Sequence, residues 1–278
     1  MPTTTWRPIR TFDRARFAAA RLQAHHATQW LARTARAFVP LRPDDGHTNL
    51  GWDDAFGGFV SHALPDGARL GLRFTDLSLA LLERDAAAPT DLFPLDGRCD
   101  ADACAWLMGH AGMRNLAPDA LNAPLPYMLP ERESGGTYTA DTEALGQLAT
   151  WFSNAKGALE AVRDDIVARK LDAPPVRCWP HHFDLDTLVT VAPDRTSGVG
   201  FEPGDGYYDE PYFYVSLYPA PDAGTLPALP PIGHWHTQGF TAAVATAQRI
   251  LAVKDQGSAV AGFLRAATDA TIAALKSL

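Results

Sequence analysis

The sequence predicts an α+β fold in which helices cover antiparallel sheets. Some long segments carry apolar residues at every third or fourth position, which is typical of one helix face, and some short segments carry them at every second position, which is typical of a strand. The two kinds of segment do not alternate one for one, which argues against a parallel α/β fold. With 46% hydrophobic and 20% charged residues, the composition is that of a globular protein.

The first predicted helix runs from Asp13 to Phe38. Apolar or small residues recur in it at Phe17, Ala20, Ala24, Ala27, Leu31, Ala35 and Phe38. This spacing places them on one face, and Pro40 ends the helix.

Strands and a second helix are predicted next. Segments 50–60 and 68–83 each read as a strand from their apolar residues. Residues 91–97 read as a short edge strand, because Pro94 has no N–H to donate to a neighbour. A helix is predicted from Asp100 to about Met113.

Residues 117–136 contain four prolines and no apolar period, so neither a helix nor a central strand is expected there. The next segment, from Asp141 to Lys170, has a strict helical stripe, and Asp141 is placed to cap it. We therefore expect a linker at 117–136 followed by a long helix.

The last part of the chain is predicted to contain two strands and two helices. Segments 176–191 and 211–219 alternate as strands do, and in the second the tyrosines share the face opposite Phe213. Helices are expected at about 239–254 and at 258–277.

The two halves repeat the order of helix, paired strands, loop and helix. "WDDAF" at 52–56 and "WPHHF" at 179–183 also lie 127 residues apart, close to the spacing of the two main helices. We therefore expect an internal duplication, with an N-terminal half at 1–116, a linker at 117–136 and a C-terminal half at 137–278 that carries the site.

A candidate metal site begins in the segment 176–191. If this segment is one extended strand, His182, Asp184 and Asp186 share a face. An imidazole and a carboxylate two positions apart suit a divalent metal such as Zn, Fe or Mn. The segment "GHWHT" supplies His234 and His236, which share one face if the segment is extended. The predicted ligands are therefore His182, Asp184, His234 and His236.

Two residues are candidates for acid and base chemistry. Asp205 lies between glycines in "PGDG", where the backbone can approach a ligand closely, and His181 adjoins the predicted ligands. These residues together predict a metal-dependent hydrolase that acts on a small polar metabolite. Two alternatives stay open: a metal-free protein that binds a small ligand, and a purely structural histidine cluster.

Composition limits the possible partners. The net charge of −8 provides no basic surface for nucleic acid, and no apolar run is long enough to cross a membrane. Neither a nucleotide nor a flavin is indicated by any phosphate-binding motif. Three cysteines without CxxC spacing, and an N-terminus without a signal-peptide pattern, favour a cytoplasmic protein. The oligomeric state is left open.

The segments "WPHHFD", "PGD", "PYFYV" and "HWHT" resemble those of an uncharacterised bacterial family. The resemblance extends over most of the chain and includes "DDGHTNLGW" at 44–52. Because no activity is assigned to this family, the resemblance implies no reaction.

Overall fold

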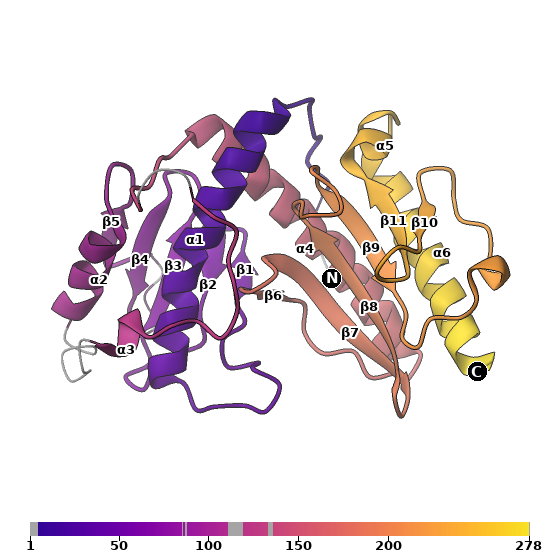
Figure 1. Ribbon diagram of the computed structural model, residues 1–278, viewed down its shortest axis with the longest axis horizontal. Helices are drawn as coiled ribbons and strands as arrows, with labels where there is room; N and C mark the ends of the chain where they lie inside the picture. Colours follow the sequence, from indigo (N-terminus) through magenta and orange to yellow (C-terminus); the bar gives the residue numbers. More distant parts are fainter. Residues whose placement is uncertain (1–4, 85, 87, 111–118, 133–135, 278) are drawn as a thin grey trace. The chain divides into compact units, whose positions relative to one another are not determined.

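The computed structural model describes residues 5–84, 86, 88–110, 119–132 and 136–277. It has two antiparallel sheets together with long helices, so the α+β prediction is confirmed (Figure 1). No helix in these residues is both long and apolar enough to span a bilayer.

The chain divides into two compact units that are interleaved along the sequence. The N-terminal unit comprises Phe12–Ala149 and Cys178–Phe183, and the C-terminal unit comprises Met1–Thr11, Thr150–Arg177 and Asp184–Leu278. The predicted division at 1–116, 117–136 and 137–278 instead makes each half a single continuous segment of the chain. The helix α4 (Thr142–Ala168) starts in one unit and ends in the other. The apolar stripe of α4 continues across the boundary between the two units, so the sequence does not indicate where that boundary lies.

The N-terminal unit contains a five-stranded antiparallel sheet whose strands follow chain order. Its strands are β1 (Gly51–Asp53), β2 (Gly58–Val60), β3 (Arg69–Arg73), β4 (Ser78–Leu82) and β5 (Asp91–Pro94). Its other helices are α1 (Arg14–Phe38), α2 (Asp100–Gly109) and α3 (Asp119–Asn122). α1 packs against β3, and β5 is the edge strand expected from Pro94.

Both long helices predicted from apolar stripes are present. α1 begins after Asp13, whose carboxylate accepts from the Arg16 N–H at 3.0 Å, and Phe17 is among its buried residues. α4 begins after Asp141, which accepts from the Ala144 N–H at 3.2 Å. Such caps bond backbone N–H groups that have no partner within the helix.

Three predicted single strands are instead pairs of strands joined by four-residue turns. The turns occupy 54–57, 74–77 and 180–183. Each ends on a residue with positive φ: 69° at Gly57, 47° at Leu77 and 68° at Phe183. The prediction of one strand over 176–191 is therefore wrong. Because the turns contain apolar residues, the sequence pattern does not show where one strand ends and the next begins.

The predicted linker is partly helical. Asp119–Asn122 forms α3, so the expectation that no helix occurs in 117–136 is wrong for this turn. The helix predicted over 100–113 is α2, Asp100–Gly109. Residues 111–118 and 133–135 lie outside the described part of the chain.

The C-terminal unit contains strands in the order β10-β11-β9-β8-β7, all antiparallel to their neighbours. The strands are β7 (Asp184–Ala192), β8 (Arg195–Glu202), β9 (Tyr212–Ser216), β10 (His234–His236) and β11 (Ala242–Thr246). β6 (Arg177–Trp179) lies where the chain passes between the units, and a 3-10 turn covers Ala223–Thr225. α5 (Ala247–Leu251) follows β11, and α6 (Gln256–Ser277) ends the described chain.

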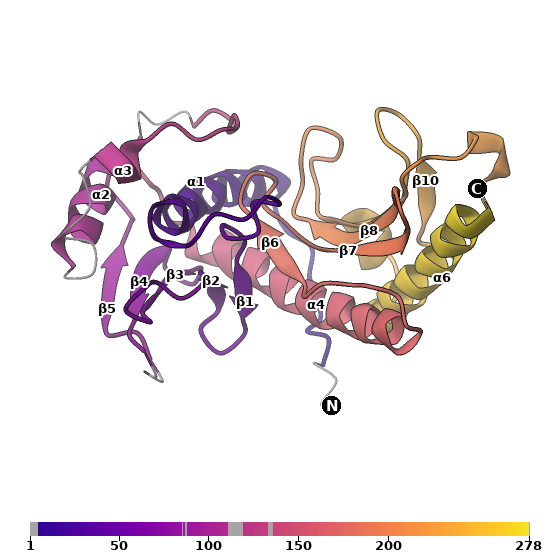
Figure 2. The ribbon, with the colours of Figure 1, turned by 90° about the horizontal axis from the view of Figure 1, so that it is seen from below.

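One face of this sheet is covered by helices: Figure 2 shows β7 and β8 above α4, and α6 contacts β7, β8 and β9. Phe201 of β8 contacts Trp151 and Phe152 of α4, with ring centroids 5.8 and 5.5 Å apart. Ser197 on the same face meets Thr271 of α6 at 3.1 Å. These contacts identify the face of β8 that carries the odd-numbered residues as the helix-covered face.

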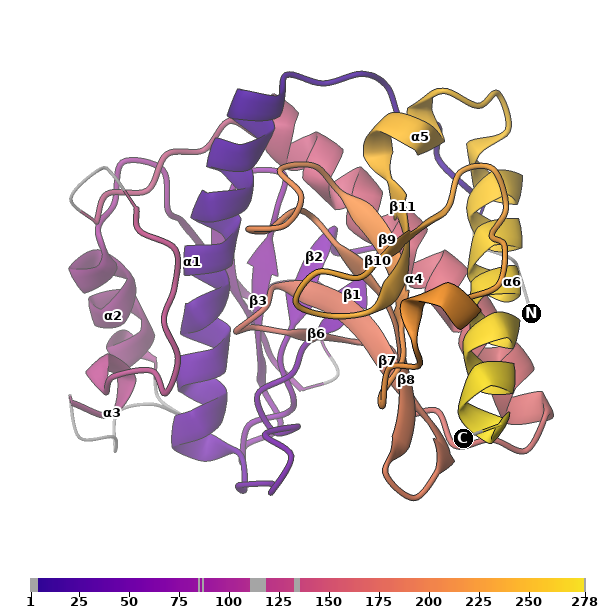
Figure 3. The ribbon, with the colours of Figure 1, turned by 45° about the vertical axis from the view of Figure 1, so that its right-hand side comes forward.

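The helix predicted at 239–254 is wrong in its first part. Residues Ala242–Thr246 form β11 between β9 and β10, and only Ala247–Leu251 is helical (Figure 3). All five residues of β11 are buried. Backbone pairing on both sides overrides the helical preference of this alanine-rich segment.

The structure does not show the expected duplication. In the N-terminal sheet the strands follow chain order, whereas in the C-terminal unit β11 lies between β9 and β10. The duplication therefore stays a hypothesis.

Candidate functional site

The second face of the C-terminal sheet carries nearly all of the candidate residues of this unit. Side chains alternate between the two faces along each strand, and the pairing register aligns neighbouring strands. The residues that share one face of the whole sheet can therefore be identified. We call this second face the polar face. Its members include Asp184 and Asp186 of β7, Gly198, Gly200 and Glu202 of β8, Tyr212, Tyr214 and Ser216 of β9, Ala242, Val244 and Thr246 of β11, and His234 and His236 of β10.

Asp184 is the most unusual residue of the polar face. It is 6% exposed, and its Oδ2 accepts a 2.6 Å hydrogen bond from the Tyr214 hydroxyl. Its Oδ1 is buried and has no hydrogen-bond partner in the described structure. Burial raises the pKa of Asp184 to about 6, and the charge of Asp205 adds to this. A carboxyl group that titrates near neutrality can both give and take a proton.

Gly200 makes room for the contact between Tyr214 and Asp184. It pairs with Tyr214 across β8 and β9. A Cβ at Gly200 would lie 2.3 Å from Cζ and 2.4 Å from the hydroxyl oxygen of Tyr214. The ring therefore lies directly over the glycine backbone, and any side chain at this position would displace it.

Asp205 lies in the loop between β8 and β9. Its Oδ1 accepts from the backbone N–H groups of Tyr207 and Tyr208 at 2.8 and 2.9 Å, and its Oδ2 accepts from the Tyr212 hydroxyl at 2.9 Å. Three donors thus hold this carboxylate in place. It shapes the loop and fixes Tyr212, and its charge also reaches Asp184.

Tyr208 joins the two histidines of β10. Its hydroxyl lies 3.0 Å from Nε2 of His234 and 3.0 Å from Nδ1 of His236. Nε2 of His236 lies 2.6 Å from the Gln238 carbonyl, which only accepts, so this nitrogen carries a proton. The Tyr208 hydroxyl therefore bridges the two imidazole rings. Burial lowers the pKa of His234, which favours the neutral ring.

Aromatic contacts connect the two ends of the polar face. The Tyr208 ring centroid lies 4.8 Å from that of Tyr212, which in turn lies 6.2 Å from Tyr214. Phe240 packs 4.4 Å from His236 on the other side. Contacts therefore run from the Asp184 carboxylate through three tyrosines to the two imidazoles.

The polar face brings some predicted site residues together and separates others. Asp184 and Asp186 share it, as do His234 and His236, as predicted from alternation. However, β7 and β10 are separated by β8, β9 and β11. Four strand spacings of about 4.8 Å correspond to roughly 19 Å. Asp184 therefore does not share a metal ion with His234 or His236, which corrects the predicted ligand set.

His181 and His182 belong to the N-terminal unit, in the turn 180–183. Strand alternation stops at Trp179, so the expected shared face of His182 with Asp184 is wrong. The rings of His181 and His182 lie 4.2 Å apart, and burial lowers the pKa of His181 to about 4. A base with so low a pKa is mostly unprotonated at neutral pH and weakly basic.

The turn itself is held by buried groups of α1. The Pro180 carbonyl lies 2.9 Å from Nε2 of His25 and accepts from Gln29 at 2.7 Å. Phe183 stacks on His25 with ring centroids 4.9 Å apart. Pro180 and Phe183 of the "WPHHF" motif thus have a packing role in the N-terminal unit.

Among the residues that the structure describes, no group of three or more His, Cys, Asp or Glu side chains is arranged to hold a metal ion.

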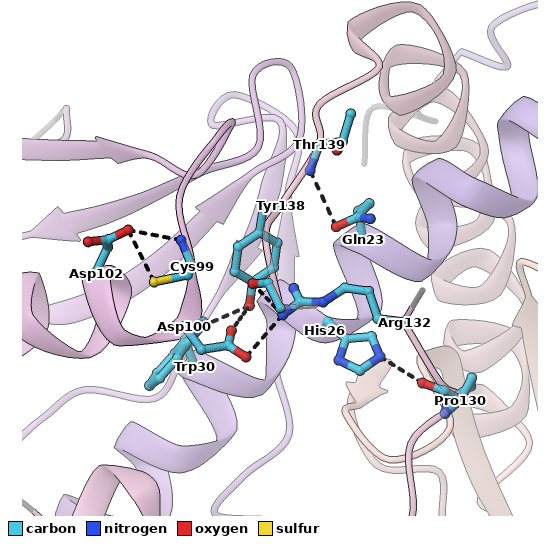
Figure 4. Close-up of polar contacts among 11 residues, drawn as sticks. Gln23, His26, Trp30, Cys99, Asp100, Asp102, Pro130, Arg132, Tyr138 and Thr139 are labelled. Carbon is cyan, nitrogen blue, oxygen red and sulfur yellow. Dashed lines mark hydrogen bonds and ion pairs between the residues drawn. The ribbon is translucent and has the colours of Figure 1, made fainter. Parts of the chain in front are cut away.

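A second polar cluster lies in the N-terminal unit (Figure 4). The Arg132 side chain is 5% exposed, bonds Asp100 at 3.0 Å and lies 4.1 Å from the Tyr138 ring centroid. The Tyr138 hydroxyl donates to Asp100 at 2.8 Å and accepts from Trp30 at 3.0 Å. These bonds join α1 and α2 to the segment that follows them, so the cluster has a structural explanation.

Two parts of the site were not predicted from the sequence. Tyr208 was not singled out, because it lies in a loop and its partners are distant in sequence. Gly200 could have been found from the segment "GVGFEPG", because a glycine inside a strand often marks a place where another group approaches the backbone closely.

Comparison of the chain with protein-family models, curated proteins and solved structures finds no match.

Proposed function

We propose that the polar face of the C-terminal unit binds a small polar molecule without a metal ion, and that Asp184 is its anchor. The observation that carries this proposal is the buried Oδ1 of Asp184, which has no partner in the described structure. Buried carboxylate oxygens are almost always hydrogen-bonded, because leaving one unpaired costs free energy. A ligand that donates a hydrogen bond would satisfy this oxygen.

The surroundings of Asp184 support a binding role. Tyr214 holds the carboxylate in one orientation, and the Tyr212 and Tyr208 rings continue the surface beside it. Ligand sites commonly combine aromatic walls with a few oriented polar groups. A titratable group with a perturbed pKa is a further common feature of such sites.

Binding without a metal is better supported than the metal-dependent hydrolysis expected from the sequence. Both ring nitrogens of His236 are hydrogen-bonded, and so is Nε2 of His234. Asp184 lies on a different strand of the sheet. Elemental analysis of the purified protein tests the alternative, because a metalloenzyme would contain stoichiometric Zn, Fe or Mn.

The proposal can be tested through the tyrosine rings. The chain has seven tyrosines, so a protein with 13C-labelled tyrosine rings gives few signals, and Tyr→Phe variants assign them. A panel of small amines, polyols, amino acids and carboxylic acids is added to the wild-type protein. We expect at least one compound to shift the Tyr212 and Tyr214 signals, and we expect Asp184→Asn to abolish that shift.

Asp222→Asn is the matched control. It removes the same charge from an exposed loop residue of the same unit. It should leave the shifts unchanged. The proposal is wrong if no compound shifts these two signals, or if the shifts persist in Asp184→Asn.

A further inference from the structure

The charge around Asp184 indicates the chemical class of the ligand. This inference rests on the proposed function, because it concerns the molecule that the polar face binds. Asp184 lies one position beyond the Leu185–Phe201 pair, which aligns it with Glu202 on β8. Glu202 in turn pairs with Tyr212 on β9. Residues directly opposite on neighbouring strands have Cβ atoms about 4.5–5.5 Å apart.

The negative charges of this region act on the same phenols. The pKa of Tyr214 is raised by burial and then by Asp184, Asp186 and Glu202. The pKa of Tyr212 is raised by burial and then by Glu202, Asp205 and Asp184. Four carboxyl groups are therefore close enough to interact electrostatically with two neighbouring rings.

We infer that the ligand presents a protonated amine to Oδ1 of Asp184. An ammonium group has several N–H donors, so it can bond the unpartnered oxygen and also offset part of the surrounding negative charge. An uncharged hydroxyl would supply the hydrogen bond only. An anion would be repelled by Asp184.

The aromatic rings favour the same class. Tyr212 and Tyr214 lie beside Asp184 on the polar face, and the negative face of an aromatic ring attracts an organic cation. The charge of Arg249 affects Tyr208 and His234 at the opposite end of the polar face. Its Nη1 donates to the Gly233 carbonyl at 2.9 Å.

The test compares three probes of equal chain length: butylamine, butan-1-ol and butanoate. The 13C signals of the Tyr212 and Tyr214 rings are followed at neutral pH while each probe is titrated. We expect butylamine to shift both signals, with butan-1-ol much weaker and butanoate without effect. In Asp184→Asn the affinity for butylamine should fall by about tenfold or more, the loss typical of a charge-assisted bond. In Asp222→Asn it should change by less than about twofold.

Lower pH provides a second readout that does not depend on a variant. Below about pH 6 Asp184 becomes protonated, so its attraction for butylamine should weaken while any binding of butan-1-ol should not.

The outcomes separate this inference from the proposed function. If butan-1-ol or butanoate shifts the two signals as strongly as butylamine and the shift requires Asp184, the polar face binds ligands but the amine class is wrong. If none of the three probes shifts the signals, the amine inference is wrong, and the broader panel then decides whether the polar face binds any ligand. If butylamine shifts them equally in Asp184→Asn, Asp184 is not the contact and both proposals fail.

Discussion

The hydroxyl of Tyr214 donates a 2.6 Å hydrogen bond to Oδ2 of Asp184, while Oδ1 of the same carboxylate is buried without a partner in the described chain. One carboxylate oxygen therefore has a hydrogen-bond partner in this part of the chain and the other has none. This arrangement should lower stability when no ligand is bound, because a charged group is kept away from water. Groups that are retained at a cost in stability are frequently functional.

Asp184→Asn should stabilise the ligand-free protein at neutral pH. The pKa of Asp184 is about 6 in the folded protein and 3.8 is its usual value, so the unfolded chain loses this proton first as pH rises. The free energy of unfolding of the wild type should thus fall between about pH 4 and 6 and then stay lower. The amide retains an acceptor for Tyr214. Above pH 6 we expect a gain on the order of 1–3 kcal/mol.

Urea denaturation of both proteins at about pH 4 and pH 7.5 measures this difference. The gain should shrink toward zero at the lower pH. An equal loss of stability at both values would show that the buried charge is not the cause.

Gly200→Ala should destabilise the C-terminal unit and separate Tyr214 from Asp184. The added Cβ would lie 2.3 Å from Cζ of Tyr214, which forces the ring to move. Overpacking of this kind typically costs about 1–3 kcal/mol. Gly262→Ala is the matched control: it lies on an exposed position of α6 with nothing within 4 Å of its Cβ. It should stabilise the protein by up to about 1 kcal/mol, through helix propensity. Equal effects of the two substitutions would contradict this account.

Tyr208→Phe should break the link between His234 and His236. Without the hydroxyl, Nδ1 of His236 and Nε2 of His234 each lose a hydrogen-bond partner. We expect the 15N signals of both rings to change and the stability to fall by about 1 kcal/mol. Tyr218→Phe, at a residue that is 69% exposed, should change neither quantity. Unchanged imidazole signals in Tyr208→Phe would disprove the link through the hydroxyl.

His25 should make the protein less stable in mild acid. Burial lowers its pKa from 6.5 to about 4, so the unfolded chain takes up a proton on this ring before the folded protein does. Stability should therefore fall as pH decreases from about 6.5 to 4, by up to about 3 kcal/mol.

His25→Gln removes this ionisation, while Gln29 still binds the Pro180 carbonyl. Thermal unfolding between about pH 4 and 7.5 should show the variant losing less stability than the wild type as pH falls. Parallel pH profiles would mean that His25 is already protonated in the folded protein.

The sequence alone determined the long helices and the orientation of side chains along individual strands. The apolar stripes of α1 and α4, the alternation in β9 and the shared orientation of His234 and His236 were all predicted. Helical and strand periods are set by local backbone geometry, so a single segment carries enough information to reveal them.

Only the tertiary structure decided which of these faces meet. That Ala242–Thr246 is a strand, that Pro180–Phe183 is a turn of the other unit, and that three strands separate Asp184 from His234 all depend on pairing between distant segments. Strand order is set by hydrogen bonds and side-chain packing between parts of the chain far apart in sequence. No local pattern encodes that order, so the sequence could not show that the predicted metal ligands lie on separated strands.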